Sequence, residues 1–245
     1  MNEILTKSLA EIVTADHRAA AVFERNGLDF CCKGKRSLST ACAEKGIEPE
    51  ALVGQLEESL KVPLPIADFN QYSLSDLIDH IVKTHHAYVK KELPELLGYV
   101  QKVASKHGER HPEILPVFEN LFQLAEEMDL HMKKEENILF PRIKEIEKMS
   151  GENHQPAEMP GHVSIQSPIA MMELEHDQAG AFMASIRQLT NDYTPPPDAC
   201  TTYRLSFAGL QAFEADLHQH VHLENNILFP KALRLFAGDS SHLKG

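Results

Sequence analysis

The sequence predicts an all-α protein, an up-down-up-down four-helix bundle preceded by a small helical N-terminal domain. Apolar residues recur mainly at spacings of three and four, and no sustained alternation of period two indicates a strand. Four long segments with the helical period follow one another through short connections, which is typical of neighbouring antiparallel helices.

The elements follow in order along the chain. Residues 1–62 are predicted to form the N-terminal domain, and the proline-containing stretch VPLPIADFNQYS predicts a linker over residues 63–72. The bundle is expected over residues 73–238, with helices at roughly 73–106, 112–148, 163–190 and 198–236. The connections read GERHP, SGENHQPAEMPGH and NDYTPPPD. Pro94, Pro141 and Pro230 fall inside the predicted helices, where each is expected to kink or end its helix locally.

Composition narrows the classes of function. The net charge of −12 disfavours binding to nucleic acid or to an anionic membrane, so a small ligand or a protein is the expected partner. The N-terminus does not resemble a signal peptide, and no apolar run is long enough to span a bilayer. Four cysteines are too few for a disulfide scaffold and indicate the reducing cytoplasm. The 14 histidines are the unusual feature, because histidine commonly binds metals or moves protons.

One motif is written twice. HMKKEENILFP begins at His131, and HVHLENNILFP begins 89 positions later at His220. On a helix the pairs His131 with Glu135 and His220 with Glu224 each share one face. That face is otherwise apolar in both copies, with Leu121, Leu124, Met128 and Ile138 in the first and Leu210, Phe213, Leu217 and Ile227 in the second. Burying a carboxylate there is costly unless it is paired or binds a metal. The shared ILFP is interpreted as core packing and a helix kink.

The other two bundle helices each add one histidine. His176 is the only polar member of a stripe formed by Ile165, Ile169, Met172, Ala179, Met183 and Ile186. His86 interrupts the stripe Ile78, Val82, Val89, Leu93, Leu97 and Val100. Its neighbour His85 is expected about 100° away, towards a face with Lys and Glu. His218 and His222 are expected on the side opposite His220, beside Gln211, Glu214 and Asn225.

The histidines and glutamates on the four inward faces predict a metal site with four imidazoles and two carboxylates in the bundle interior. Two metals, each with two His and both bridged by Glu135 and Glu224, leave two positions on an octahedral ion for a bridging oxo or hydroxo group and a small ligand. Ligation without thiolate suits iron or manganese and tolerates zinc, and the helical-bundle architecture favours iron. A buried polar network without metal is the alternative, and the spacing leaves open which histidines share an ion.

Further segments carry a resemblance to a known family. They are DFCC with Ala41-Cys42 beyond it, HHAYVKKELPEL, EEMDLHMKKEENILFP, MELEHDQAG and LENNILFP. With them, nearly the whole chain resembles the hemerythrin-like di-iron proteins of the Repair of Iron Centres type. The resemblance implies repair of iron-sulfur clusters damaged by nitric oxide or oxidants, two oxo-bridged iron ions per chain and a homodimer. The implied metal ligands are His86, His131, Glu135, His176, His220 and Glu224.

The resulting hypothesis is a cytoplasmic di-iron protein that donates iron to damaged iron-sulfur proteins. Oxygen-carrying hemerythrins, which this bundle also resembles, use five histidines, whereas four are found here. Fewer ligands should hold iron more loosely or leave more room for a small ligand, which suits donation. The alternatives are an enzyme that reduces NO to nitrous oxide and a protein that senses O2 or NO. No catalytic side chain beyond the metal ligands is predicted.

The cysteines add a second hypothesis. Adjacent Cys31 and Cys32 are possible redox thiols, because a disulfide between them would be strained and easily reduced. Cys42 is an alternative disulfide partner, and nearby Lys and Arg residues can lower a thiol pKa. The competing interpretation is that these small thiols pack the N-terminal domain. Cys200 has no evident partner in the sequence and is interpreted as structural.

Overall fold

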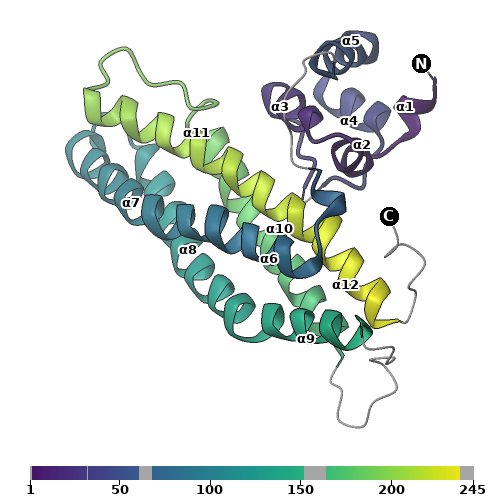
Figure 1. The fold of residues 1–245 in the computed structure, drawn as a ribbon. Helices are drawn as coiled ribbons and strands as arrows, with labels where there is room; N and C mark the ends of the chain where they lie inside the picture. The colour runs from purple at the N-terminus through teal and green to yellow at the C-terminus, as the bar shows by residue number, and fades with distance from the viewer. Residues whose placement is uncertain (1, 32, 61–67, 152–163, 238–245) are drawn as a thin grey trace.

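The computed structural model describes residues 2–31, 33–60, 68–151 and 164–237, and within these ranges it contains helices and no strand. A single isolated bridge joins Ser8 and Ser37. The predicted fold, a helical bundle with a small helical N-terminal region, is therefore confirmed (Figure 1). Cys32, residues 63–67 of the predicted linker and residues 152–162 of the predicted loop lie outside the described residues.

The N-terminal region consists of α1 (Asn2–Thr6), α2 (Leu9–Ala15), α3 (Arg18–Arg25), α4 (Leu38–Lys45) and α5 (Pro49–Leu60). Ser8 and Glu11 form a capping box at the start of α2, and Ser37 caps α4. Gly46 ends α4 in the left-handed conformation, with φ of 65°, which glycine adopts without a steric penalty. The boundaries of this region as an independent domain stay a prediction.

The bundle begins after the 3-10 turn η1 (Phe69–Gln71). Its first segment is α6 (Leu74–Ile81), η2 (Val82–His86) and α7 (Ala87–His107), and its second is α8 (Ile114–Lys134), η3 (Glu135–Leu139) and α9 (Phe140–Gly151). The third is α10 (Gln166–Leu189), and the fourth is α11 (Thr201–His222), η5 (Leu223–Leu228) and α12 (Phe229–Phe236). The turns η2, η3 and η5 are π-helical, so each inserts one extra residue into an otherwise α-helical segment.

The helices pack as neighbours around a common axis (Figure 1). The helix α8 lies against α7 and α10, α11 also contacts both of these helices, and α9 packs on α6 and α12. The helix α7 continues through Pro94, so of the two predicted effects, a kink or an end of the helix, this proline does not produce the second. Pro141 and Pro230 follow η3 and η5 as the second residues of α9 and α12, so the helix is irregular directly before each of them.

The buried apolar residues form two clusters. One joins the N-terminal helices to the half of the bundle formed by α7, α8, α11 and the second half of α10, and it includes Phe23, Val89 and Leu210. The other fills the opposite half around α6, α9 and α12 and includes Ile143 and Ile169. The turns η2, η3 and η5 lie where one cluster gives way to the other, and they carry polar side chains into the interior.

The predicted stripes differ from the observed core where a π-helical turn intervenes. The stripe of α10, which has no such turn, is buried throughout its length. Ile138 was predicted to be inward, but its exposed fraction is 60% and Leu139 is buried instead, at 3%. Val82, in η2, is only partly buried, while Ile81 is in the core. The extra residue in each turn rotates the side chains that follow it relative to those before it.

Candidate metal centre

The six residues predicted to bind metal meet in the bundle interior. They are at most 2% exposed and come from η2, α8, η3, α10, α11 and η5: His86, His131, Glu135, His176, His220 and Glu224. Each of the four bundle segments therefore contributes at least one side chain. The apolar clusters above and below this layer exclude water from it.

The six side chains form two groups that share both carboxylates. One group contains His86 and His220 with Glu135 and Glu224, and the other contains His131 and His176 with the same two glutamates. Within each group, the potential ligand atoms lie within 4.8 Å of one another. The sequence had left open which histidines belong together, and the fold pairs His86 with His220 and His131 with His176.

The carboxylates lie between the two groups. One oxygen of Glu135, Oε2, is 3.4 Å from His86 Nε2 and 3.3 Å from His131 Nε2. Glu224 uses both of its oxygens, because Oε1 is 3.1 Å from His220 Nε2 and Oε2 is 3.1 Å from His176 Nε2. Each glutamate therefore contacts one histidine of each group, as a carboxylate that bridges two cations must.

Hydrogen bonds fix the orientation of three of the imidazoles. His86 Nδ1 lies 2.7 Å from Glu136 Oε1, and His131 Nδ1 lies 2.9 Å from Glu175 Oε2. The carboxylates are acceptors, so these Nδ1 atoms carry the proton and donate it. In the neutral ring this leaves a lone pair on Nε2, directed at the interior, which is the usual state of a metal-binding histidine.

The third orienting contact joins His176 Nδ1 to Asn225 Oδ1 at 2.8 Å. Sequence reasoning had placed Asn225 on the opposite side of its helix, and this is wrong because Asn225 lies within the π-helical turn η5. Glu136 and Glu175 were not identified from the sequence at all. Sequence position could have indicated these residues, because each of them directly precedes or follows a predicted ligand: Glu136, Glu175 and Asn225.

Imidazole nitrogens and carboxylate oxygens face one another across the interior. The facing Nε2 atoms are 3.1 Å apart in the pair His86 and His220 and 3.0 Å apart in the pair His131 and His176. Both oxygens of Glu135 and Oε2 of Glu224 have no hydrogen-bond partner among the described residues. Burying a carboxylate oxygen without a hydrogen bond is costly, and two facing Nε2 atoms repel each other unless one of them carries a proton. Cations placed between these atoms would relieve both costs, so the donor set fits a pair of metal ions.

The electrostatics of the six side chains point the same way. Burial opposes charge on His86 and His131, but the nearby carboxylates of Glu135 and Glu224 outweigh it and raise the pKa of His86 to about 10 and that of His131 to about 9. Burial lowers the pKa of His220. Burial by itself would raise the pKa of Glu224, but the surrounding histidines outweigh burial and lower this pKa well below its ordinary value. Each group thus contains one histidine that holds a proton where a cation would bind.

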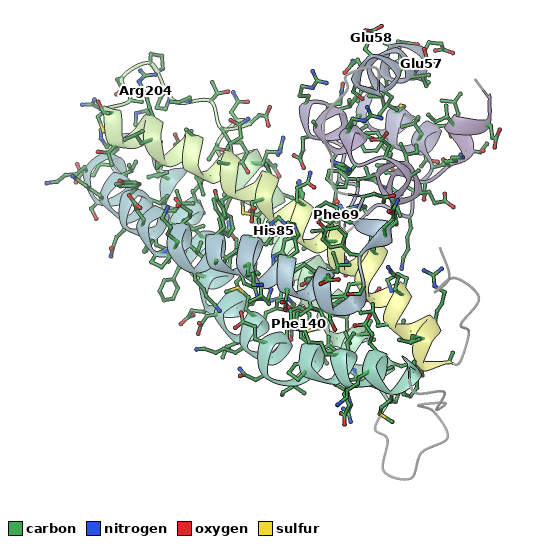
Figure 2. The ribbon with its side chains drawn as sticks, in the orientation of Figure 1. Glu57, Glu58, Phe69, His85, Phe140 and Arg204 are labelled. Carbon is green, nitrogen blue, oxygen red and sulfur yellow. The ribbon has the colours of Figure 1, made fainter. Side chains whose placement is uncertain are left out.

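The ILFP part of the repeated motif contacts two of the predicted ligands directly. The ring of Phe140 stacks on His86, with centroids 5.7 Å apart, and Phe229 stacks on His176 at 6.1 Å. These phenylalanines occupy equivalent positions in the two copies. Figure 2 labels Phe140 together with His85, and both lie near the point where α6 passes into α7. The shared motif therefore supplies the packing that holds two of the imidazoles in place, in addition to general core packing.

Three other histidines were predicted to lie outside the centre. His85 belongs to neither group, but it is buried rather than facing Lys and Glu on the surface. Its Nδ1 is 2.9 Å from Asp216 Oδ1, and its ring stacks on His220. His218 and His222 also stay outside both groups, and they contact Phe30 of the N-terminal region. They therefore help to join the two parts of the chain.

The described cysteines are not joined by a disulfide. Cys31 and Cys42 are both buried, so the alternative pairing between them is not formed. Burial raises the pKa of the Cys42 thiol, which suits a packing role. Cys200 is exposed at the start of α11, where its Sγ lies 3.4 Å from His107 Nε2.

The bundle and its buried cluster of four histidines and two glutamates define a hemerythrin-type protein. Residues 77–232 match the hemerythrin HHE cation-binding domain, and residues 5–60 match a domain of unknown function, DUF542. The chain belongs to the Repair of Iron Centres family of iron-sulfur cluster repair proteins. It is 37% identical to the iron-sulfur cluster repair protein YtfE of Escherichia coli O157:H7, over 92% of this chain and 96% of that protein. The corresponding protein of Dickeya chrysanthemi is 38% identical, over 93% and 97% of the two chains.

The helices of the described ranges include none with the length and apolar character required to cross a bilayer.

Proposed function

We propose that the two groups each bind one iron ion and that Glu135 and Glu224 bridge the two ions. The observation that carries this proposal is that each buried glutamate contacts a histidine of both groups. The cation-binding description of the matching domain supports it. In this arrangement His86 and His220 hold one ion, while His131 and His176 hold the other. The bound irons supply exchangeable ferrous or ferric ions and redox chemistry.

The proposed activity is the repair of iron-sulfur clusters damaged by nitrosative or oxidative stress, with iron donated from this centre. The printed function of the similar proteins, iron-sulfur cluster repair, supports this activity. Iron is then the cargo of the reaction, and damaged iron-sulfur proteins are the partners. Four imidazoles and two carboxylates do not fill the coordination of two octahedral ions, so each ion retains positions for an incoming ligand.

A cavity beside the centre supports access by small ligands. It has a volume of about 280 Å³ and lies between the N-terminal helices and the bundle. Its lining includes His17 and Phe69 on one side and Leu223 and Ile227 on the other. Leu223 and Ile227 belong to η5, the turn that carries Glu224. Figure 2 shows Phe69 at this junction of the two regions. The cavity therefore offers a small ligand such as NO or O2 a binding space next to η5.

The decisive experiment is iron transfer in the presence of a competing chelator. The iron-loaded protein is incubated anaerobically with an iron-sulfur enzyme whose cluster has lost iron, and recovery of the client's cluster is followed by its absorption and activity. We expect recovery to persist when an excess of a ferrous chelator intercepts free iron. A Glu135→Leu, Glu224→Leu double variant should bind less iron and support no recovery. If the chelator abolishes recovery by the unaltered protein, direct donation is wrong.

Reduction of two NO molecules to nitrous oxide is the alternative, because shared carboxylates would hold two ions side by side. This reaction consumes two electrons and two protons, so it requires a renewable reductant. Anaerobic incubation with NO and an electron donor, followed by gas analysis, separates NO reduction from iron donation.

Sensing of O2 or NO would instead give saturable binding without iron loss or turnover. A homodimer is also proposed, and sedimentation of the iron-loaded protein tests it.

A further inference from the structure

A second cluster of metal-binding side chains lies where the N-terminal region meets the bundle. It contains Asp29 and Cys31, from the segment after α3, and His218 from α11. One potential ligand atom from each residue lies within 4.8 Å of the others. We propose that these three residues bind one divalent transition-metal ion, Zn²⁺ or Fe²⁺, separately from the centre inside the bundle.

The first argument is the geometry of the three ligands. A tetrahedral ion with metal–sulfur bonds of about 2.3 Å and metal–nitrogen or metal–oxygen bonds of about 2.0 Å separates its ligand atoms by roughly 3.3–3.6 Å. Starting from separations of no more than 4.8 Å, the ligand atoms must close by at most about 1.5 Å. Cys31 Sγ already lies 3.2 Å from Asp29 Oδ1, so this pair is at a suitable distance.

The second argument is the carboxylate behind the histidine. His218 Nδ1 lies 2.5 Å from Glu24 Oε1, a residue of α3. A hydrogen bond of this kind fixes the tautomer and leaves Nε2 as the nitrogen for a metal, and a carboxylate in this position is a regular feature of histidine-metal sites. The edge of the Phe30 ring also packs against His218, with centroids 6.0 Å apart. The imidazole is therefore oriented by two contacts from the N-terminal region.

The third argument is the choice of ion that the ligands imply. A thiolate, an imidazole and a carboxylate favour zinc or ferrous iron, whereas Mg²⁺ and Ca²⁺ prefer sites made only of oxygen atoms. Binding replaces the thiol proton of Cys31 by a sulfur–metal bond and releases that proton to solvent. Three protein ligands leave the fourth tetrahedral position open to a small ligand. Because the ligands come from both parts of the chain, the ion would also hold these parts together.

Cobalt(II) absorption tests the proposal independently of the bundle centre. The metal-free full chain is titrated with Co²⁺ under anaerobic conditions, and the near-ultraviolet charge-transfer band of a thiolate bound to Co²⁺ is recorded. The six residues of the bundle centre include no sulfur, so they cannot produce this band. We expect the band to appear as Co²⁺ is added and to disappear in Cys31→Ala and His218→Gln. Glu24→Gln should weaken the affinity by about 10–100-fold.

Cysteine controls identify the thiolate. Cys32→Ala, Cys42→Ala and Cys200→Ala should each keep the band at full intensity. Circular dichroism establishes whether each variant is folded. If Cys31→Ala does not fold, the His218→Gln variant decides the test, because His218→Gln retains the Cys31 thiol. The proposal is overturned if no band appears, if Cys31→Ala or a folded His218→Gln variant keeps it, or if a control variant loses it. Loss of iron binding in the bundle centre would not change this result, so the two proposals fail separately.

Discussion

Replacing Leu139 by alanine should destabilise the protein far more than the same change at the neighbouring Ile138. Glu135 points into the interior, and a continuous α-helix would bring Ile138, three positions later, onto the same face. The π-helical turn η3 spans Glu135–Leu139 and adds one residue, so Leu139 occupies that place instead. The exposed fraction is 3% for Leu139 and 60% for Ile138.

The size of the effect follows from this burial. Leucine to alanine removes three carbon groups, which at about 0.8 kcal/mol each corresponds to about 2.4 kcal/mol of lost burial. The cavity left in the cluster around Phe140 and Ile143 adds to this loss, so the unfolding free energy should fall by about 2–5 kcal/mol. At Ile138 the side chain is mostly in solvent, and the change should remain within about 0.5 kcal/mol.

Denaturant unfolding of the metal-free proteins measures both values, from the transition midpoint and its slope. Leu130→Ala on α8 is the matched control, because this leucine is 60% exposed and should behave like Ile138. If Ile138→Ala costs as much as Leu139→Ala, the helix continues without the extra residue. The register that positions Glu135 and Phe140 would then be incorrect.

Three further predictions concern the metal. Glu136→Gln should lower iron affinity by about 10–100-fold, because Glu136 orients His86, while Glu145→Gln at an exposed site on α9 should have no effect; competition with a chelator measures both. Metal must displace the protons held by His86 and His131, whose pKa values are raised to about 10 and about 9, so affinity should rise with pH. From pH 7 to 8 the product of the two binding constants should increase roughly a hundredfold, and a pH-independent titration would contradict this. Removal of metal by a chelator should lower the melting temperature, since a ligand at about a thousand times its Kd stabilises the folded state by about 4 kcal/mol, and an unchanged melting curve would argue against binding to the folded state.

The helical segments and the inward faces were largely predictable, and α10 shows why. Its apolar stripe keeps a regular spacing of three and four, and every member from Ile165 to Ile186 is buried. A segment with unbroken α-helical geometry places side chains on its faces according to sequence position alone. The same reasoning brought His176 and the other five predicted ligands to one interior layer.

Prediction was less accurate next to the π-helical turns. Asn225 and Ile138 were assigned to the wrong sides, and both lie within such turns. The extra residue is tolerated because it brings ligands from η2, η3 and η5 into register with their partners, a condition set by the other helices. Nothing in the local spacing of HMKKEENILFP or HVHLENNILFP reveals it.

Contacts between distant segments were also beyond the sequence. The partnership of His85 with Asp216 spans two bundle helices, and that of His218 with Glu24 joins the bundle to the N-terminal region. Periodicity gives the direction of a side chain relative to its own helix, but not which neighbouring element covers that direction. His218 and His222 were placed away from the centre, yet the helices that pack over them could not be foreseen.

The sequence by itself determined that the chain is helical, that its two halves repeat one motif, and that four histidines and two glutamates point inward. These properties depend on residue type and on spacing along a single helix. The tertiary structure alone decided that His86 is paired with His220 and His131 with His176, and that each glutamate lies between the pairs. It also decided that Asp29 and Cys31 meet His218. Such groupings depend on how rigid helices pack in space, and that packing is set by side chains distributed along the whole chain.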